Sequence, residues 1–274
     1  MRNPFKVQES VAQKLDRVRG ISSNEIFVEK IQSPWLIEAK DSEKKAAERY
    51  EPGSIEEDKK WITEIETKKP IETEEEILAK YSLMEIFNEL GSESGFMIIP
   101  LGRFDQYKTA NDFIINFPES EKKNKNLGIE VGVATDEDRQ IEDSNKNLKS
   151  ILRGNFEPVA SAEKLKYLED EELIKDFIPK IRIIATKENV NKLAKLAMNL
   201  KEKKLSNGEK AELRKLKDEI ETQIKTQIFN YIDALNKYIT RERMISGSDK
   251  MKIEEAKKYL EKLRNIKSNF FITK

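Results

Sequence analysis

The spacing of hydrophobic residues changes along this chain, and the changes predict where its helices and strands lie. From residue 73 to 90 hydrophobic residues recur every three or four positions, which predicts a helix. Thr73 and Glu76 have the spacing of a capping box at the start of this helix, and Gly91 is expected to end it.

Between residues 91 and 135 the chain instead carries short β-branched and aromatic runs, which are typical of strands. Three strands are predicted, at 96–99, 112–117 and 127–134, and they are expected to form an antiparallel meander. A fourth strand is predicted at 180–185, with a helix before it and another after it. The order from residue 73 is therefore αβββαβα, around a small mixed sheet.

Helices are predicted at both ends of the chain. In the first part, Ser10 is expected to cap a helix with Val11, Leu15 and Val18 on one face, and residues 54–57 form a second capping box. In the last part, one long hydrophobic stripe from 213 to 239 and a shorter one from 253 to 266 flank a turn. This pattern predicts an antiparallel helical hairpin that packs on the body of the protein.

These elements predict an α+β protein in three parts. The parts are an N-terminal helical segment at 1–72, an αβββαβ core at 73–202 and a C-terminal helical hairpin at 203–274.

Charge and hydropathy narrow the partners that this fold can have. The 274 residues carry 51 Lys and Arg against 51 Asp and Glu, so the whole molecule has no field that steers it toward nucleic acid or membrane. Nucleic acid stays possible through a local basic patch, a protein partner is favoured, and a membrane partner is not expected. No secretory leader and no run of about 18 apolar residues is found, so a cytoplasmic location is expected.

The absence of both cysteine and histidine excludes several kinds of site. Disulfides, cysteine nucleophiles, Ser-His-Asp triads and zinc sites built from Cys or His all require residues that the chain lacks. A metal here would be a hard cation such as Mg²⁺ or Mn²⁺, held by carboxylates.

The αβββαβ order resembles the core of the PD-(D/E)xK nuclease superfamily. In that family an Asp starts the second strand, an acidic residue lies on the third, and a Lys follows two residues later. Asp112 and Glu130 match the two acidic positions, and the resemblance implies that they bind Mg²⁺ or Mn²⁺ together. Gly132 stands where the family has its Lys, so one catalytic group is missing from the pattern.

Other residues could supply the missing groups. Lys108 precedes the second predicted strand, and Lys146 and Lys149 lie on the helix after the third, where a relocated lysine is known in the superfamily. Glu85 or Glu89 could add a further carboxylate.

A second resemblance covers residues 94–200. The segments 103–112 and 127–131, followed by Tyr167 and the strand after Pro179, are similar to uncharacterised proteins of candidate-phylum bacteria with reduced genomes. This resemblance implies no activity.

The acidic residues also have ordinary structural explanations. Asp112 could bond a turn amide at the start of a strand, and Glu130 could lie on a solvated face of the sheet. Two functions therefore remain open. The first is a degenerate nuclease-like core that acts as an interaction or structural module, and the second is a Mg²⁺-dependent nuclease that uses Asp112 and Glu130 with a relocated Lys146 or Lys149.

Overall fold

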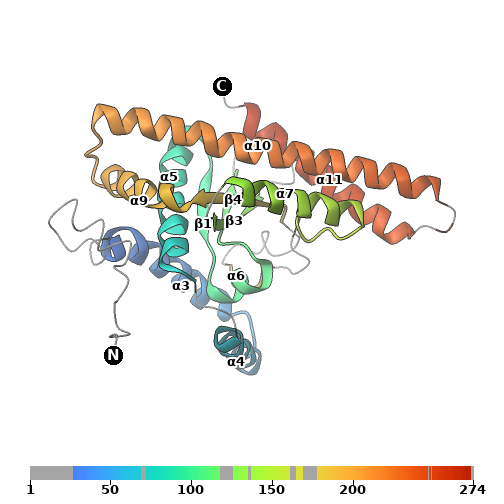
Figure 1. The fold of residues 1–274 in the computed structure, drawn as a ribbon. Coiled ribbons are helices and arrows are strands. Elements are labelled where there is room, and N and C mark those ends of the chain that lie inside the picture. The colour runs from blue at the N-terminus through green and yellow to red at the C-terminus, as the bar shows by residue number, and fades with distance from the viewer. Residues whose placement is uncertain are drawn as a thin grey trace, which may run out of the picture.

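The structure of the chain is a computed structural model (Figure 1). It describes residues 27–68, 72–117, 126–134, 137–160, 165–168, 178–245, 247 and 249–272. The helix predicted at the N-terminus, with Ser10 as its cap, lies outside the described residues.

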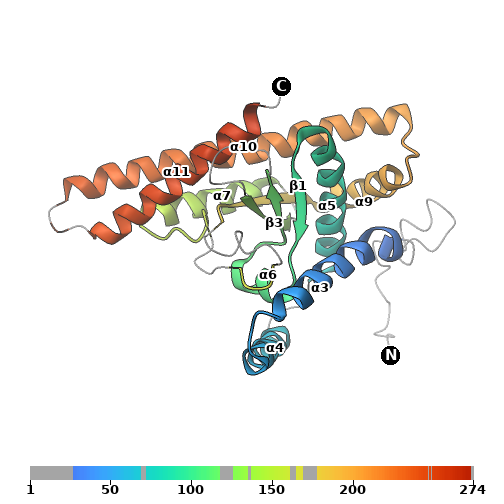
Figure 2. The ribbon, with the colours of Figure 1, turned by 180° about the vertical axis from the view of Figure 1, so that it is seen from behind.

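A four-stranded mixed sheet lies at the centre of the fold (Figure 2). Its strands are β1 (Met97–Pro100), β2 (Phe113–Asn116), β3 (Asn126–Ala134) and β4 (Lys180–Thr186), in the order β1-β2-β3-β4. The first two pairings are antiparallel and β3 pairs with β4 in parallel. The predicted meander, the fourth strand and the α+β class are thus confirmed.

Helices α5 (Glu74–Ser94) and α9 (Lys187–Lys201) pack against each other and against the sheet, while α7 (Glu137–Leu152) connects β3 to the parallel strand β4. The predicted capping box of α5 is present, because the Thr73 Oγ1 accepts from the Glu76 amide and the Glu76 carboxylate accepts from the Thr73 amide.

The predicted end of α5 is wrong by one turn. The helix continues past Gly91 and ends at Gly95, which has a left-handed φ of 72°. Gly91 is needed for a different reason, since a Cβ on it would lie 2.3 Å from the Phe96 carbonyl oxygen. The chain can therefore fold back over Gly91 only because that residue has no side chain.

The N-terminal part consists of a π-helical turn, η1 (Val28–Gln32), followed by α3 (Ser33–Ala47) and α4 (Pro52–Lys68). Helix α4 begins at Pro52, so the capping box expected at Ser54 is wrong: a proline is preorganised for the first turn of a helix, and here it starts the helix two residues earlier. The Ser54 hydroxyl instead accepts from the Lys166 ammonium at 2.9 Å.

One polar cluster ties α4 to the core. The Lys166 ammonium reaches Asp58 and Ser54 of α4 and lies 4.9–5.5 Å from the ring centroids of three aromatic residues. The fully buried Asp105, on the short helix α6 (Arg103–Thr109), accepts from the Lys166 and Tyr167 amides at 2.7 and 2.8 Å. The three aromatic rings near the Lys166 ammonium are those of Tyr50, Phe104 and Tyr167. Ionic, amide and cation–π contacts thus all involve the two neighbouring residues Lys166 and Tyr167.

The buried position of Asp105 predicts a contribution to stability that is largest at acid pH. Burial raises its pKa to about 6, against the lowering effect of the two amides that it accepts from. At Asp105 the folded state therefore binds more protons than the unfolded state between about pH 4 and pH 6, and the contribution of this residue to stability falls as the pH rises through that window. Asp105→Asn should remove this contribution, which amounts to at most about 3 kcal/mol. Urea unfolding of both proteins at pH 4.5, 6 and 7.5 measures the difference; a constant difference would contradict the raised pKa.

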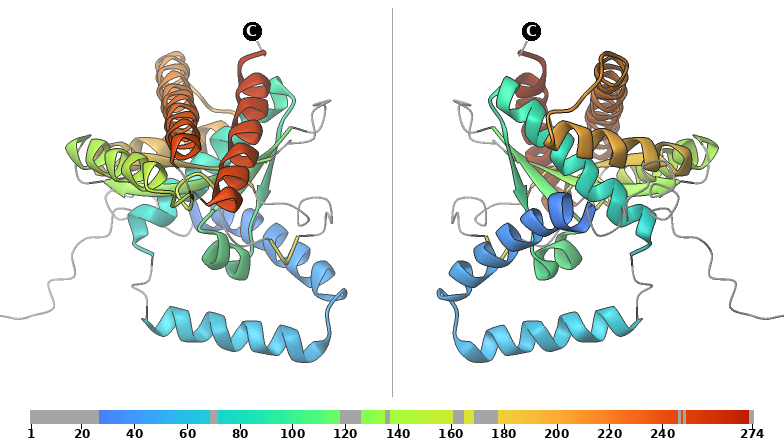
Figure 3. Two further views of the ribbon diagram at one scale, coloured as in Figure 1. Left: turned by 90° about the vertical axis from the view of Figure 1, so that its right-hand side faces the viewer. Right: turned by 90° about the vertical axis from the view of Figure 1, so that its left-hand side faces the viewer.

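The C-terminal part forms the predicted hairpin of α10 (Asn207–Met244) and α11 (Lys250–Ile272), which are orange and red in Figure 3. Helix α10 runs along the whole molecule (Figure 1). One hydrophobic cluster contains residues from η1 and α3, from the sheet, and from both hairpin helices. The hairpin therefore packs on the body of the protein, as expected.

Helix α10 also covers an edge of the sheet. The Gln227 side chain donates to the Arg182 carbonyl and accepts from the Arg182 amide at 2.5 and 3.1 Å. Gln223, one turn earlier, makes the same pair of hydrogen bonds to Ile184 at 3.4 and 3.2 Å. Since β4 is an edge strand, these two glutamines take the place of a fifth strand.

Candidate functional site

The structure brings the backbones of the two predicted metal ligands together. Phe113 of β2 is paired with Ile129 of β3, so continuing the register by one residue places Asp112 opposite Glu130. The Asp112 amide donates to the Ile129 carbonyl at 2.7 Å, and its Oδ2 accepts from the Val131 amide at 2.7 Å. The Asp112 side chain thus serves as an acceptor in the pairing of the two strands.

The second oxygen of Asp112 faces a buried lysine. The Lys80 Nζ of α5 lies 3.6 Å from the Asp112 Oδ1 and 2.8 Å from a carboxylate oxygen of Glu72. Burial lowers the pKa of Lys80, but the two carboxylates outweigh this effect and the net direction is upward. Burial also raises the pKa of Asp112 to about 6, although Lys80 and the Val131 amide oppose it.

Glu130 has other partners, on β4. Its two carboxylate oxygens lie 3.6 Å from the Lys180 Nζ and 3.4 Å from the Arg182 Nε. These three residues line a polar cleft of about 300 Å³ together with Tyr231 and Asn147. Burial raises the pKa of Tyr231 to about 12, so its hydroxyl stays protonated at neutral pH.

The Arg182 side chain lies beside position 132. A Cβ on Gly132 would lie 3.0 Å from two nitrogens of the Arg182 guanidinium. The space into which a side chain at 132 would extend is therefore filled by a cation from the neighbouring strand.

The other candidate residues lie away from this pair. Lys146 and Lys149 are exposed on α7, and neither lines the cleft beside Glu130. The Lys108 ammonium lies 4.4 Å from the centroid of the Trp61 ring. Glu85 is bound by Lys201 at 3.1 Å, and Glu89 is exposed.

A divalent metal ion at the predicted pair would have to displace cations of the chain itself. Asp112 shares the Lys80 ammonium with Glu72, and Glu130 faces both Lys180 and Arg182. Within the described ranges, no group of three or more Asp or Glu residues could hold a metal ion.

Sequence reasoning missed Lys80 although a signal was present. Lys80 falls between Ile77 and Met84 on the face of α5 that the hydrophobic spacing predicts to be buried. A lysine at such a position requires an acidic partner, and Asp112 was the nearest candidate on the predicted sheet.

Comparison of the chain with protein-family models, with curated proteins and with solved structures finds no match in any of the three. Among the described residues, every helix is too short or too polar to cross a bilayer.

Proposed function

We propose that this protein is a non-catalytic interaction module built on a nuclease-like αβββαβ core. The observation that carries the proposal is the neutralisation of both candidate catalytic carboxylates by cations of the chain itself. Asp112 is held by Lys80 and a backbone amide, and Glu130 is held by Lys180 and Arg182. These contacts join α5, β2, β3 and β4, so the acidic residues act as links between elements.

Two further features support a role in binding other proteins. The net charge of zero supplies no long-range attraction for a polyanion. Large parts of the chain outside the αβββαβ core are charged helices, which offer surfaces for a partner.

Calorimetric titration of Mn²⁺ tests this proposal. We expect the wild-type protein to release no more heat than the Asp112→Ala, Glu130→Ala double variant, because neither carboxylate is available to a metal ion. Circular dichroism of the double variant establishes that it has folded. Micromolar binding by the wild type that is lost in a folded double variant would overturn the proposal and lead directly to nuclease assays.

A Mg²⁺-dependent nuclease is the second candidate, and Lys80 is the observation that favours it. Its ammonium is buried beside Asp112, so α5 would supply the lysine that the nuclease pattern lacks at 132. In that case Lys80→Arg should abolish cleavage of plasmid DNA in Mg²⁺ while the protein stays folded. Lys146→Ala and Lys149→Ala, on the exposed face of α7, should leave cleavage unchanged.

A further inference from the structure

The end of the C-terminal hairpin exposes three large hydrophobic side chains to water. Met244, the last residue of α10, and Met251, in the first turn of α11, are 81% and 82% exposed, and Ile245 is 50% exposed. Both helices project past α7 and the sheet at this end (Figures 1 and 2). Single exposed hydrophobic residues are ordinary, but three at one projecting end mark a contact site. We call residues 241–245 and 249–252 the hairpin tip.

The hairpin tip is also basic. It has four basic and two acidic residues, which gives a net charge of +2 in a chain whose total charge is zero. Both acidic residues are engaged within the tip: Glu242 pairs with Arg241 at 2.7 Å, and the Asp249 Oδ1 accepts from the Met251 and Lys252 amides at 2.9 and 3.3 Å. The basic residues are Arg241, Arg243, Lys250 and Lys252.

The positive charges of the tip are therefore the ones that a partner meets. Three of its basic residues are exposed and form no ion pair with any residue that the structure describes. The acidic residues that follow on α11 are engaged, Glu254 by Lys257 and Glu255 by the Tyr259 hydroxyl at 2.8 Å. The three available cations are Arg243, Lys250 and Lys252.

This combination fits the surface of an anionic lipid bilayer. Such a surface presents phosphate groups to the cations and, directly beneath them, hydrocarbon to the hydrophobic side chains. The tip is convex, so a folded protein would need a matching cavity, whereas lipid headgroups can move around a projecting side chain. Nucleic acid fits less well, because residues 241–252 contain no aromatic ring on which a base could stack.

We infer that the hairpin tip is a docking site for anionic membrane surfaces, into which Met244, Ile245 and Met251 insert. The contact is peripheral, since the hairpin lies on the bilayer by its end and spans nothing. The charge balance of the whole chain, from which no membrane partner is expected, does not describe this end of the molecule. This inference does not depend on whether the core binds a metal ion.

Sedimentation of the full chain with lipid vesicles tests the inference. The protein should bind vesicles made of equal parts phosphatidylglycerol and phosphatidylcholine in dilute buffer, and it should stay in solution with vesicles of phosphatidylcholine alone. Raising the salt to about 1 M, where charges are screened beyond about 3 Å, should weaken the binding at least tenfold.

Two double variants separate the charged from the hydrophobic contribution. Arg243→Gln with Lys252→Gln should lower the partition coefficient about 20-fold, because each basic residue near an anionic surface strengthens binding roughly fivefold. Met244→Ser with Met251→Ser should lower it roughly tenfold through the loss of buried apolar area. All four residues are exposed, so circular dichroism should show an unchanged fold.

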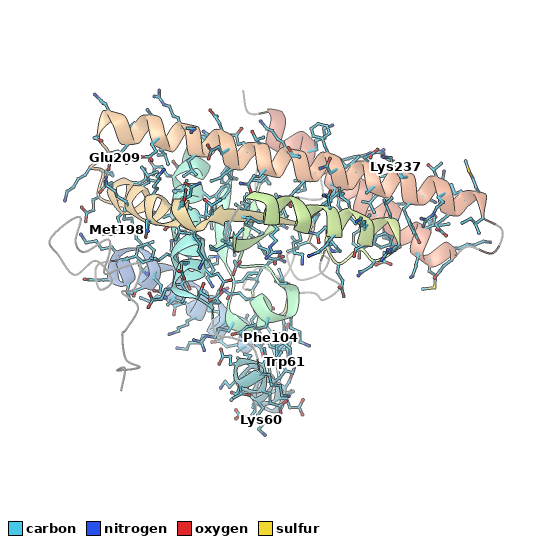
Figure 4. The ribbon with its side chains drawn as sticks, in the orientation of Figure 1. Lys60, Trp61, Phe104, Met198, Glu209 and Lys237 are labelled. Atoms are coloured by element: carbon cyan, nitrogen blue, oxygen red, sulfur yellow. The ribbon has the colours of Figure 1, made fainter. Side chains whose placement is uncertain are left out.

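Each double variant has a matched control elsewhere on the molecule. Lys215→Gln with Lys237→Gln removes the same charge from exposed positions of α10 outside the tip, and Figure 4 labels Lys237 about 10 Å before Met244. Ile37→Ser with Met97→Ser removes two hydrophobic side chains that are 59% and 53% exposed. Both controls should bind vesicles within about twofold of the wild type, since effects at distant exposed sites are small.

A fluorescent label shows which part of the chain enters the bilayer. The chain has no cysteine, so Met251→Cys accepts a single nitrobenzoxadiazole group. Its emission should rise and shift to the blue on anionic vesicles, while the same label at Lys237→Cys should respond much less.

Three results would overturn the inference. The first is that the wild type does not bind the anionic vesicles in dilute buffer, which would leave the tip as a surface for a protein partner. The second is binding that the tip variants and their controls weaken equally. The third is binding during which the label at position 251 stays in water, because another part of the chain would then hold the membrane.

Discussion

Replacing Lys80 with methionine is expected to lower the free energy of unfolding by about 3–4 kcal/mol at pH 8, because it leaves a buried carboxylate without its cation. Lys80 is 3% exposed and lies 3.6 Å from Asp112. Methionine keeps most of the volume of the side chain, so packing changes little. The loss measured by urea unfolding then reports mainly on the charge of Asp112.

The loss of unfolding free energy in Lys80→Met should become smaller as the pH falls. Lys80 lowers the pKa of Asp112, so without Lys80 this pKa moves above its present value of about 6. Below that pKa the carboxyl group becomes neutral and no longer needs a cation, so at pH 5 the loss should be about half that at pH 8. Adding Asp112→Asn should recover part of the stability at pH 8, since an amide oxygen still accepts from the Val131 amide.

Lys237→Met provides the control, on α10. Lys237 pairs with Asp233 at 2.7 Å, but both side chains are more than 60% exposed, so water replaces the lost ammonium and the loss should stay below about 1 kcal/mol. Equal losses for the two variants, or a Lys80→Met loss that does not change with pH, would show that the buried ion pair does not stabilise the fold.

The sheet and the hairpin could be predicted because their signals are local. The predicted ends of β2 and β3 differ from the observed ends by at most one residue. The stripe from 213 to 239 predicted the buried face of α10, where Ile220, Ile224 and Ile228 are nearly inaccessible. In each case the hydrophobic spacing alone decides which face is buried.

The elements that escaped prediction depend on partners far away in the sequence. Helix α6 has only seven residues and no hydrophobic stripe, and its buried Asp105 is satisfied by amides about 60 residues later. The residues next to Asp105 therefore do not indicate a helix, because the amides that bind its carboxylate belong to Lys166 and Tyr167.

The candidate site could also be predicted only in part, because the partners of its carboxylates lie far away in the sequence. Sequence spacing placed Asp112 and Glu130 on adjacent strands, and the register agrees with that. The cations that hold the two carboxylates come from α5 and from β4, which the spacing around residues 112–130 does not reveal. Whether two carboxylates bind a metal ion depends on these partners, so the pattern alone leaves the function open.

Removing the two glutamine side chains that bind β4 should cause the second largest loss of stability, after Lys80→Met. Gln223→Ala with Gln227→Ala leaves the amides and carbonyls of Arg182 and Ile184 without their partners in a partly buried position. Four hydrogen bonds are lost, and each contributes about 0.5–1 kcal/mol in a position that water partly reaches, so we expect a loss of about 2–4 kcal/mol. Thr226→Ala, at an exposed position of the same helix, should change stability by less than about 0.5 kcal/mol.

Replacing a glutamine with glutamate separates its role as a hydrogen-bond acceptor from its role as a donor. Gln227→Glu still accepts from the Arg182 amide but has no N–H for the Arg182 carbonyl, so it should lose about half of what Gln227→Ala loses. The double alanine variant also uncovers an edge strand with β-branched and aliphatic residues, and we expect it to aggregate on heating, as light scattering would detect. A double variant that unfolds at the urea concentration of the wild type and stays clear on heating would mean that α10 covers β4 through its hydrophobic face alone.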